Sequence, residues 1–166
     1  MVAQALHLGW YNPVRITWGC GALHSLQFDQ PAVVVADRAA LSPTTVEFLH
    51  QTLGSNCVGL AWYDGGLATV EMARQLCQKL WPVMQRQPGT AVIALGGGST
   101  LDLAKALRFR LADTSLCART WRNNQLPAVY ERHPLWLLPT TAGTGSEVTR
   151  WATLWNTEAS PAVKLS

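Results

Sequence analysis

The stretch that most restricts the fold of this chain is residues 90–107, where an apolar segment passes through consecutive glycines into a second apolar segment. Residues 91–95 are uncharged, as in a buried strand, and leucines recur at helical spacing within residues 100–107. The turn between them consists of Gly96, Gly97, Gly98 and Ser99. The stretch therefore predicts a strand, a glycine turn and a helix.

Such a turn can bring backbone N–H groups against an anion. Glycines lack Cβ atoms, so a phosphate can approach closely, and a helix starting near Ser99 adds a partial positive charge. The predicted ligand is a pyrophosphate; the alternative is an ordinary connection in which glycine serves only backbone freedom. The G-x-G-x-x-G pattern is not met, because Leu101 occupies its third small position, and no Gly-Lys-Ser/Thr follows as in a Walker motif.

Continuous apolar runs predict the strands of an α/β fold with a parallel sheet. The runs are residues 31–36, 57–63, 91–95 and 135–138. The alternation of residues 10–18 predicts an exposed strand, and residues 151–155 and 162–165 predict two strands around a turn.

Helix start and stop signals lie between these runs. Ser42 and Pro43 predict a helix start, with serine as the N-cap and proline at the first helical position. Thr69 caps a second predicted helix, which we expect to kink or end near Trp81 because Pro82 removes a helix hydrogen bond.

Asp37 directly follows the first apolar run, at the carboxyl end of a strand, where open α/β sheets bind ligands. A carboxylate there can accept hydrogen bonds from the ribose hydroxyls of an adenosine and repel a 2′-phosphate. Asp37 therefore indicates NAD, with NADP as the less favoured cofactor. The alternative is an aspartate that starts a loop or caps a turn.

Small and hydroxyl residues fill positions 139–149, after the run at 135–138. Thr140, Thr141 and Thr144 can offer hydroxyls to a ribose or an adenine edge, and the small residues let a loop lie flat against a ligand. A capping turn is the alternative. Since ligands of such sheets bind where strand ends meet, we expect this loop to face the glycine turn.

Composition excludes several classes of function. The formal charge of +3 is spread along the chain, so no basic cluster indicates nucleic acid. No apolar run approaches the roughly 20 residues that cross a membrane. The four cysteines form no C-x-x-C pair and no secretory leader precedes them, which predicts reduced thiols in the cytoplasm. The tryptophans near the chain ends are expected to pack internally or to be covered by another domain or subunit.

Two motifs in order carry a family resemblance. Gly96-Gly97-Gly98-Ser99-x-x-Asp102-x-x-Lys105, followed by residues 138–149 (LPTTAGTGSEVT), resembles the iron-containing (group III) alcohol dehydrogenases. The resemblance covers nearly the whole chain but only the N-terminal half of the family's usual length. It implies that residues 1–166 form one Rossmann-like NAD(P)-binding domain. It also implies that Asp102 contacts the nicotinamide carboxamide and that Lys164 reaches the cofactor ribose.

The same family binds its iron through one aspartate and three histidines in a helical C-terminal domain, the first two spaced as Asp-x-x-x-His. No aspartate of this chain has a histidine four residues later, and the histidines are scattered. They are His7, His24, His50 and His133. We therefore expect no catalytic residue and no Fe²⁺ or Zn²⁺ site in this chain, and the family's metal-binding domain is absent from it.

The resemblance implies the NAD(P)-binding portion of an enzyme that transfers hydride between a nicotinamide cofactor and a small alcohol or aldehyde. Residues 11–15 and 150–155 are similar to those of phosphonoacetaldehyde reductases, which indicates phosphonoacetaldehyde as a substrate. The chain alone is expected to be inactive, and a homodimer is compatible with the resemblance. The alternative is a stand-alone nucleotide-binding or interaction module without catalysis, which the missing metal ligands allow.

Overall fold

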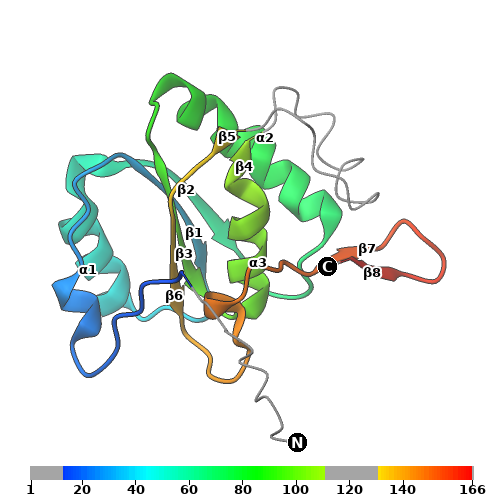
Figure 1. The fold of residues 1–166 in the computed structure, drawn as a ribbon, viewed down its shortest axis with the longest axis horizontal. Helices are drawn as coiled ribbons and strands as arrows, with labels where there is room; N and C mark the ends of the chain where they lie inside the picture. Colours follow the sequence, from blue (N-terminus) through cyan, green and yellow to red (C-terminus); the bar gives the residue numbers. More distant parts are fainter. Residues whose placement is uncertain (1–12, 111–130, 166) are drawn as a thin grey trace, which may run out of the picture.

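The computed structural model describes residues 13–110 and 131–165, whose centre is a four-stranded parallel sheet (Figure 1). The strands are β1 (Ala32–Asp37), β2 (Cys57–Tyr63), β3 (Ala91–Gly96) and β6 (Leu135–Pro139). Their order in the sheet is β2-β1-β3-β6, so β3 is an inner strand, and all of its residues are buried. The predicted α/β fold, with a parallel sheet and the strand before the glycines at its centre, is confirmed.

Helices cover both faces of this sheet (Figure 1). In the described residues, α1 (Pro43–Leu53) packs on one face, and α2 (Val70–Arg86) and α3 (Gly98–Leu107) pack on the other. Successive strand residues point to opposite faces, so Val33 joins the core beneath α2 and α3 whereas Val34 joins the core beneath α1.

The predicted helix starts at Ser42 and Thr69 are confirmed. The Thr45 amide donates to the Ser42 hydroxyl at 3.2 Å, and the Met72 amide donates to the Thr69 hydroxyl at 3.1 Å. Pro43 occupies the start of α1, where its missing N–H costs no helix hydrogen bond.

Of the two outcomes predicted for Pro82, a kink or an end near Trp81, the end is wrong, because α2 continues to Arg86. Pro82 lies on the exposed face of the helix, where water can bind the carbonyl that lacks an N–H partner. Trp81 and Met84 are buried, and the Trp81 indole donates to the Leu107 carbonyl at 2.8 Å. Packing of this last turn therefore outweighs a proline cost of about 3 kcal/mol.

Two strand predictions also need correction. Residues 13–18 form no strand, and Val14 and Ile16 are exposed; residues 10–12 of that prediction lie outside the described residues. The strand at 135–138 exists as β6, but it is only partly buried, with Trp136 37% exposed. The reason is that β6 is an edge strand of the described sheet.

Shorter elements complete the described fold. They are the 3₁₀ turns η1 (Ala22–Ser25), η2 (Gly54–Asn56) and η3 (Ser146–Val148), and the strands β4 (Phe109–Arg110), β5 (Glu131–Arg132), β7 (Leu154–Asn156) and β8 (Val163–Leu165). β4 pairs with β5, and β7 with β8, both antiparallel. The β7–β8 hairpin projects from the body of the molecule, as Figure 1 shows, and confirms the predicted pair of strands near the end of the chain.

Two further observations bear on the surface. Trp18 is 87% exposed and Trp151 is 57% exposed, so these two tryptophans do not pack into the described core. Within residues 13–110 and 131–165, no helix is both long and apolar enough to span a bilayer.

Candidate functional site

Two loops meet at the carboxyl edge of the sheet. We call residues 96–99 the glycine turn and residues 140–145 the threonine loop. β3 pairs with β6 so that Gly96 lies opposite Pro139, and the Thr140 amide donates to the Gly96 carbonyl at 3.0 Å. The prediction that these two segments face each other is confirmed, and they border the kind of crevice where open α/β sheets bind ligands.

Gly96 is required by the contacts within the domain. A Cβ atom at this position would lie 2.4 Å from Thr100 Oγ1 and 2.9 Å from the Cβ of Asp37. Both distances are too short for real contacts, so a side chain here would force the backbone to move. The same contacts place Asp37 beside the glycine turn.

The threonine loop approaches Gly97 and Gly98 so closely that a larger side chain at either position would be tightly packed against it. A Cβ at Gly97 would lie 3.2 Å from Thr141 Oγ1, and one at Gly98 would lie 3.2 Å from the Cβ of Thr144. Neither glycine has a positive φ, so the alternative in which glycine serves only backbone freedom does not account for these two. Their small size lets two loops touch.

A single residue, Gly97, separates the end of β3 from the start of α3 and is the N-cap of that helix. No side chain caps it, so the first-turn amides, which have no partner within a helix, are not closed by a side chain. Open amides together with the partial positive charge of a helix start suit an anion. At the same turn, the buried Thr100 hydroxyl has no hydrogen-bond partner among the described residues.

Asp37 ends β1, and its Oδ1 accepts a hydrogen bond from the Ala39 amide at 3.0 Å. That contact is the loop-starting role that the sequence left as an alternative. Its position next to Gly96 is also the one that a ribose-binding carboxylate would need. The two roles are compatible, because the amide contact uses one carboxylate oxygen.

Residues 64–67 border the glycine turn, although no site residue was predicted among them. The Ser99 hydroxyl donates to the Gly66 carbonyl at 3.2 Å, and the Tyr63 hydroxyl donates to the same carbonyl at 2.6 Å. Burial raises the pKa of Tyr63; the hydrogen bond with Ser99 opposes that shift and the charge of Asp37 adds to it. The two consecutive glycines after β2 are a turn signal that could have identified this loop.

Asp102 lies one turn into α3, with its side chain 15% exposed. Its Oδ1 accepts hydrogen bonds from the Ser146 hydroxyl at 2.7 Å and from the Lys105 ammonium at 3.3 Å. Its Oδ2 accepts a hydrogen bond from the Thr153 amide at 3.0 Å. The described contacts therefore place Asp102 at the junction of α3 with residues 146–153.

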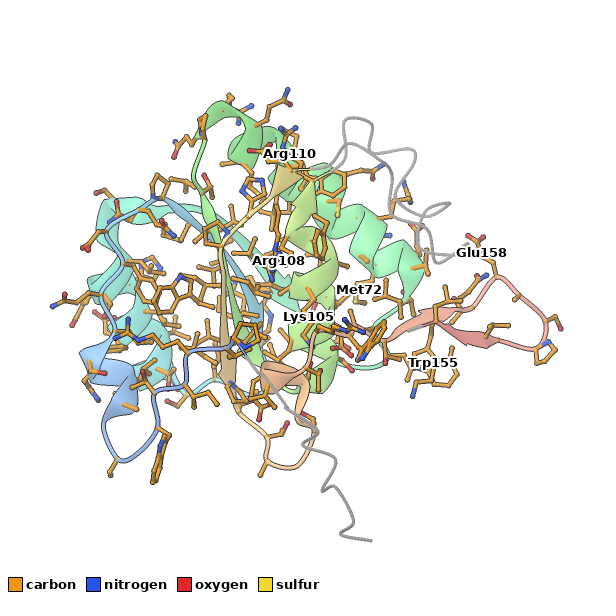
Figure 2. All side chains as sticks on the ribbon, viewed as in Figure 1. Met72, Lys105, Arg108, Arg110, Trp155 and Glu158 are labelled. Atoms are coloured by element: carbon orange, nitrogen blue, oxygen red, sulfur yellow. The ribbon has the colours of Figure 1, made fainter. Side chains whose placement is uncertain are left out.

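Lys105, to which the sequence reasoning gave no role, is 4% exposed and lies between α3 and the chain that leads to Trp155 (Figure 2). Its ammonium donates to Asp102 Oδ1 at 3.3 Å, Ser146 Oγ at 2.8 Å, Thr149 Oγ1 at 3.2 Å and the Trp151 carbonyl at 2.6 Å. Burial lowers the pKa of Lys105, and the negative charges of Asp102 and Glu147 oppose that shift. An Asp-x-x-Lys pair within an apolar helix was the available signal.

Lys164 lies apart from these residues. It is exposed on β8, opposite Trp155 of β7, in the projecting hairpin (Figures 1 and 2). No described contact joins Lys164 to the glycine turn. Of the predicted cofactor-binding residues, the structure thus brings together the glycine turn, Asp37 and the threonine loop, with Asp102 on the adjoining helix.

No group of three or more His, Cys, Asp or Glu residues that could hold a metal occurs in the described ranges. His7, Asp113 and Cys117 of the sequence lie outside them. The described residues therefore do not fit an iron site.

Comparison with known proteins identifies the family of this chain. Residues 13–166 match the family model described as iron-containing alcohol dehydrogenase. The 4-hydroxybutyrate dehydrogenase of Clostridium kluyveri is 45% identical over 111 residues, which cover 63% of this chain and 28% of that protein. The probable alcohol dehydrogenase EutG of Escherichia coli is 45% identical over 120 residues, covering 61% of this chain and 27% of that protein. The match thus spans less than a third of each of these relatives.

A solved structure shares the fold. The NADH-dependent butanol dehydrogenase A of Thermotoga maritima superposes with a TM-score of 0.71 at 15% identity, over 96% of this chain and 41% of that one. The family-model match extends over nearly all of the sequence and includes both the glycine turn and the threonine loop. The chain therefore belongs to the iron-containing alcohol dehydrogenase family.

Proposed function

We propose that the carboxyl edge of the sheet binds a nicotinamide dinucleotide, and that this chain is the cofactor-binding portion of an iron-dependent alcohol dehydrogenase or aldehyde reductase. The observation that carries the proposal is the start of α3, which no side chain caps and which faces the threonine loop across the ends of β3 and β6. The amides at Gly98 and Ser99 would bind the pyrophosphate, and the hydroxyls of the threonine loop would bind the adenosine side.

Asp37 would set the cofactor preference. Placed beside Gly96, its carboxylate can accept hydrogen bonds from a ribose and repel a 2′-phosphate, which favours NAD over NADP. Asp102 at the nicotinamide carboxamide and Lys164 at the ribose are further proposals, which rest on the family resemblance. The bound cofactor would supply the hydride chemistry, and the residues of this chain would bind and orient it.

The reaction we propose is hydride transfer between the nicotinamide and a small alcohol or aldehyde, with phosphonoacetaldehyde as one candidate. In such enzymes a metal polarises the alcohol oxygen. Because the described residues provide no cluster of metal ligands, we expect the isolated chain to bind the cofactor without turnover. The same observation favours the second candidate, a nucleotide-binding module with no catalytic role.

Calorimetry with NAD, NADP, ADP and adenosine tests the cofactor site. We expect NAD and ADP to bind, adenosine to bind far more weakly because it lacks the pyrophosphate, and NADP to bind more weakly than NAD. A folded protein that bound neither NAD nor ADP would overturn the proposal. Assays with Fe²⁺ and the chain extended to the length of its relatives would separate the two candidates, since only an enzyme portion would then support alcohol oxidation.

A further inference from the structure

We propose that Lys105 is a positioning residue that holds the threonine loop against the glycine turn. The loop's position is a property of the free protein and can be measured without a ligand. The effect on binding rests on the dinucleotide site proposed above.

The hydrogen-bond acceptors of the Lys105 ammonium show which segment of the chain it attaches to α3. Three of the four belong to Ser146, Thr149 and Trp151, in the segment that directly follows the threonine loop. Asp102, one turn earlier on the same helix, accepts hydrogen bonds from the Ser146 hydroxyl and the Thr153 amide. Five hydrogen bonds from two side chains thus tie residues 146–153 to α3.

Other hydrogen bonds at the far end of the threonine loop are local: the Ser146 amide donates to Thr144 Oγ1 at 3.4 Å and the Val148 amide donates to the Gly145 carbonyl at 3.1 Å, and neither attaches the loop to α3. At the start of the loop, the Thr140 amide donates to the Gly96 carbonyl. Residues 140–144 are exposed, and Gly143 and Gly145 have φ values of 90° and 65°, in the region that favours glycine. Because the loop is anchored at its two ends, moving Ser146 would move the loop relative to the glycine turn.

The fit between the two loops leaves little tolerance for such a movement. Thr141 and Thr144 lie so near Gly97 and Gly98 that a single Cβ would approach them to 3.2 Å. A ligand held by both loops would therefore respond to a small displacement of either one.

The choice of a charged residue supports positioning over mere filling of space. Burying an ammonium is costly unless it is paired and hydrogen-bonded, and an apolar side chain of similar length could occupy the same volume. The three N–H donors of the ammonium can all be used by the oxygen atoms of Ser146, Thr149 and Trp151, at 2.6 to 3.2 Å, while the longer 3.3 Å contact pairs its charge with the carboxylate of Asp102. The ammonium therefore specifies where residues 146–151 lie.

The test compares Lys105→Met and Ser146→Ala with the matched control Lys79→Met, at an exposed lysine of α2. Amide hydrogen exchange of the free proteins would be followed by mass spectrometry. We expect faster exchange in residues 140–151 in both variants, larger for Lys105→Met, and no change in β1 or α1. With ligands, we expect the dissociation constants of NAD and ADP to rise together by about tenfold, the equivalent of one lost hydrogen bond.

Each result decides something. Unchanged exchange in residues 140–151 of folded Lys105→Met would overturn the positioning role, and unchanged ADP affinity alongside faster exchange would overturn its effect on binding. If Lys105→Met does not fold, Ser146→Ala decides, because it keeps the ion pair of Lys105 with Asp102 and removes only the bridging hydroxyl. If the wild type binds neither ligand, the proposed function fails, and the exchange pattern alone still decides whether Lys105 holds the loop.

Discussion

Two connections lead from strand to helix at the same edge of the sheet, and they treat the helix start in opposite ways. Residues 38–42 separate β1 from α1, and the last of them, Ser42, accepts a hydrogen bond from the Thr45 amide. Only Gly97 separates β3 from α3, and no side chain caps that helix. Both helices begin with the same backbone problem, since the first amides of any helix lack partners within it.

The presence or absence of a side-chain cap indicates which helix start is available to a ligand. A capping serine or threonine stabilises a helix by about 1 kcal/mol, and the chain uses one at α1 and at α2. At α3 it has glycine, which offers no side-chain acceptor but leaves room for the threonine loop. The missing cap, together with two touching loops, marks α3 as the helix that would use its amides for a ligand. The predictions below challenge that contrast.

The largest effect is expected from Gly98→Val at the start of α3. The added side chain would collide with Thr144 and displace the threonine loop, so that pyrophosphate contacts are lost. We expect affinity for NAD and ADP to fall alike, by roughly 10- to 100-fold, as for one charge-assisted hydrogen bond. Calorimetry is the measurement, and Thr44→Val, in the exposed first turn of α1, is the matched control. Equal ADP binding by the folded Gly98 and Thr44 variants would remove the contrast between the two helices.

Asp37→Ser tests whether the connection after β1 contributes to the proposed cofactor site through its carboxylate. Removing the carboxylate beside Gly96 relieves repulsion of a 2′-phosphate, so the preference for NAD over NADP should fall by roughly tenfold. Titration of both cofactors measures this ratio. Asp29→Ser, an exposed aspartate before β1, serves as the control. A ratio that stays the same in the Asp37 variant would leave that residue with its loop-starting contact to the Ala39 amide alone.

Ser42→Ala should separate stability from binding. Loss of the cap removes the side-chain acceptor of the Thr45 amide, which keeps only the Ser42 carbonyl at 3.0 Å, and the free energy of unfolding should fall by about 1 kcal/mol. Denaturant unfolding measures this, while ADP affinity should not change because the proposed phosphate contacts are at the start of α3 and not at the start of α1. A loss of ADP binding in the folded variant would mean that both helix starts contribute to the site.

The smallest effect concerns Tyr63, whose hydroxyl interacts with Asp37 at the end of β1 and with Ser99 at the start of α3. Its pKa is raised in the folded protein, so above pH 10 the unfolded chain releases this proton first. The contribution of Tyr63 to stability is therefore present below pH 10 and is lost as the pH rises through the folded-state pKa. Unfolding measured from pH 8 to 11 should show a steeper decline for the wild type than for Tyr63→Phe. Parallel curves would contradict the assigned shift.

The parts of the fold that could be predicted from the sequence depend on local signals. Ser42-Pro43 and Thr69 have the same capping geometry in most contexts, and apolar runs such as 91–95 are buried wherever a parallel sheet forms. Pro82 gave the wrong answer because its cost is local, whereas the buried contacts of Trp81 and Met84 that keep α2 intact are not visible in the sequence.

The candidate site likewise has parts that the sequence predicted and parts that it did not. The glycine turn and the threonine loop were predicted to meet because parallel strand ends share one edge. The contacts of Lys105 with Ser146 and Trp151 join residues more than 40 positions apart. No periodicity or spacing in the sequence specifies such a contact, since it depends on how residues 146–153 return to α3. The close approach of Gly98 to Thr144 is hidden for the same reason.

The contacts of residues 131–165 with the rest of the molecule predict how the protein would behave if its backbone were cut. They are held to residues 13–110 by the β3–β6 and β4–β5 pairings and by the buried hydrogen bonds of Lys105 and Asp102. A backbone cut within residues 111–130 would leave all of these contacts intact, and the shorter fragment would then behave as a bound peptide that supplies the threonine loop. In the proposed dinucleotide site, we expect cofactor affinity then to depend on the concentration of that fragment.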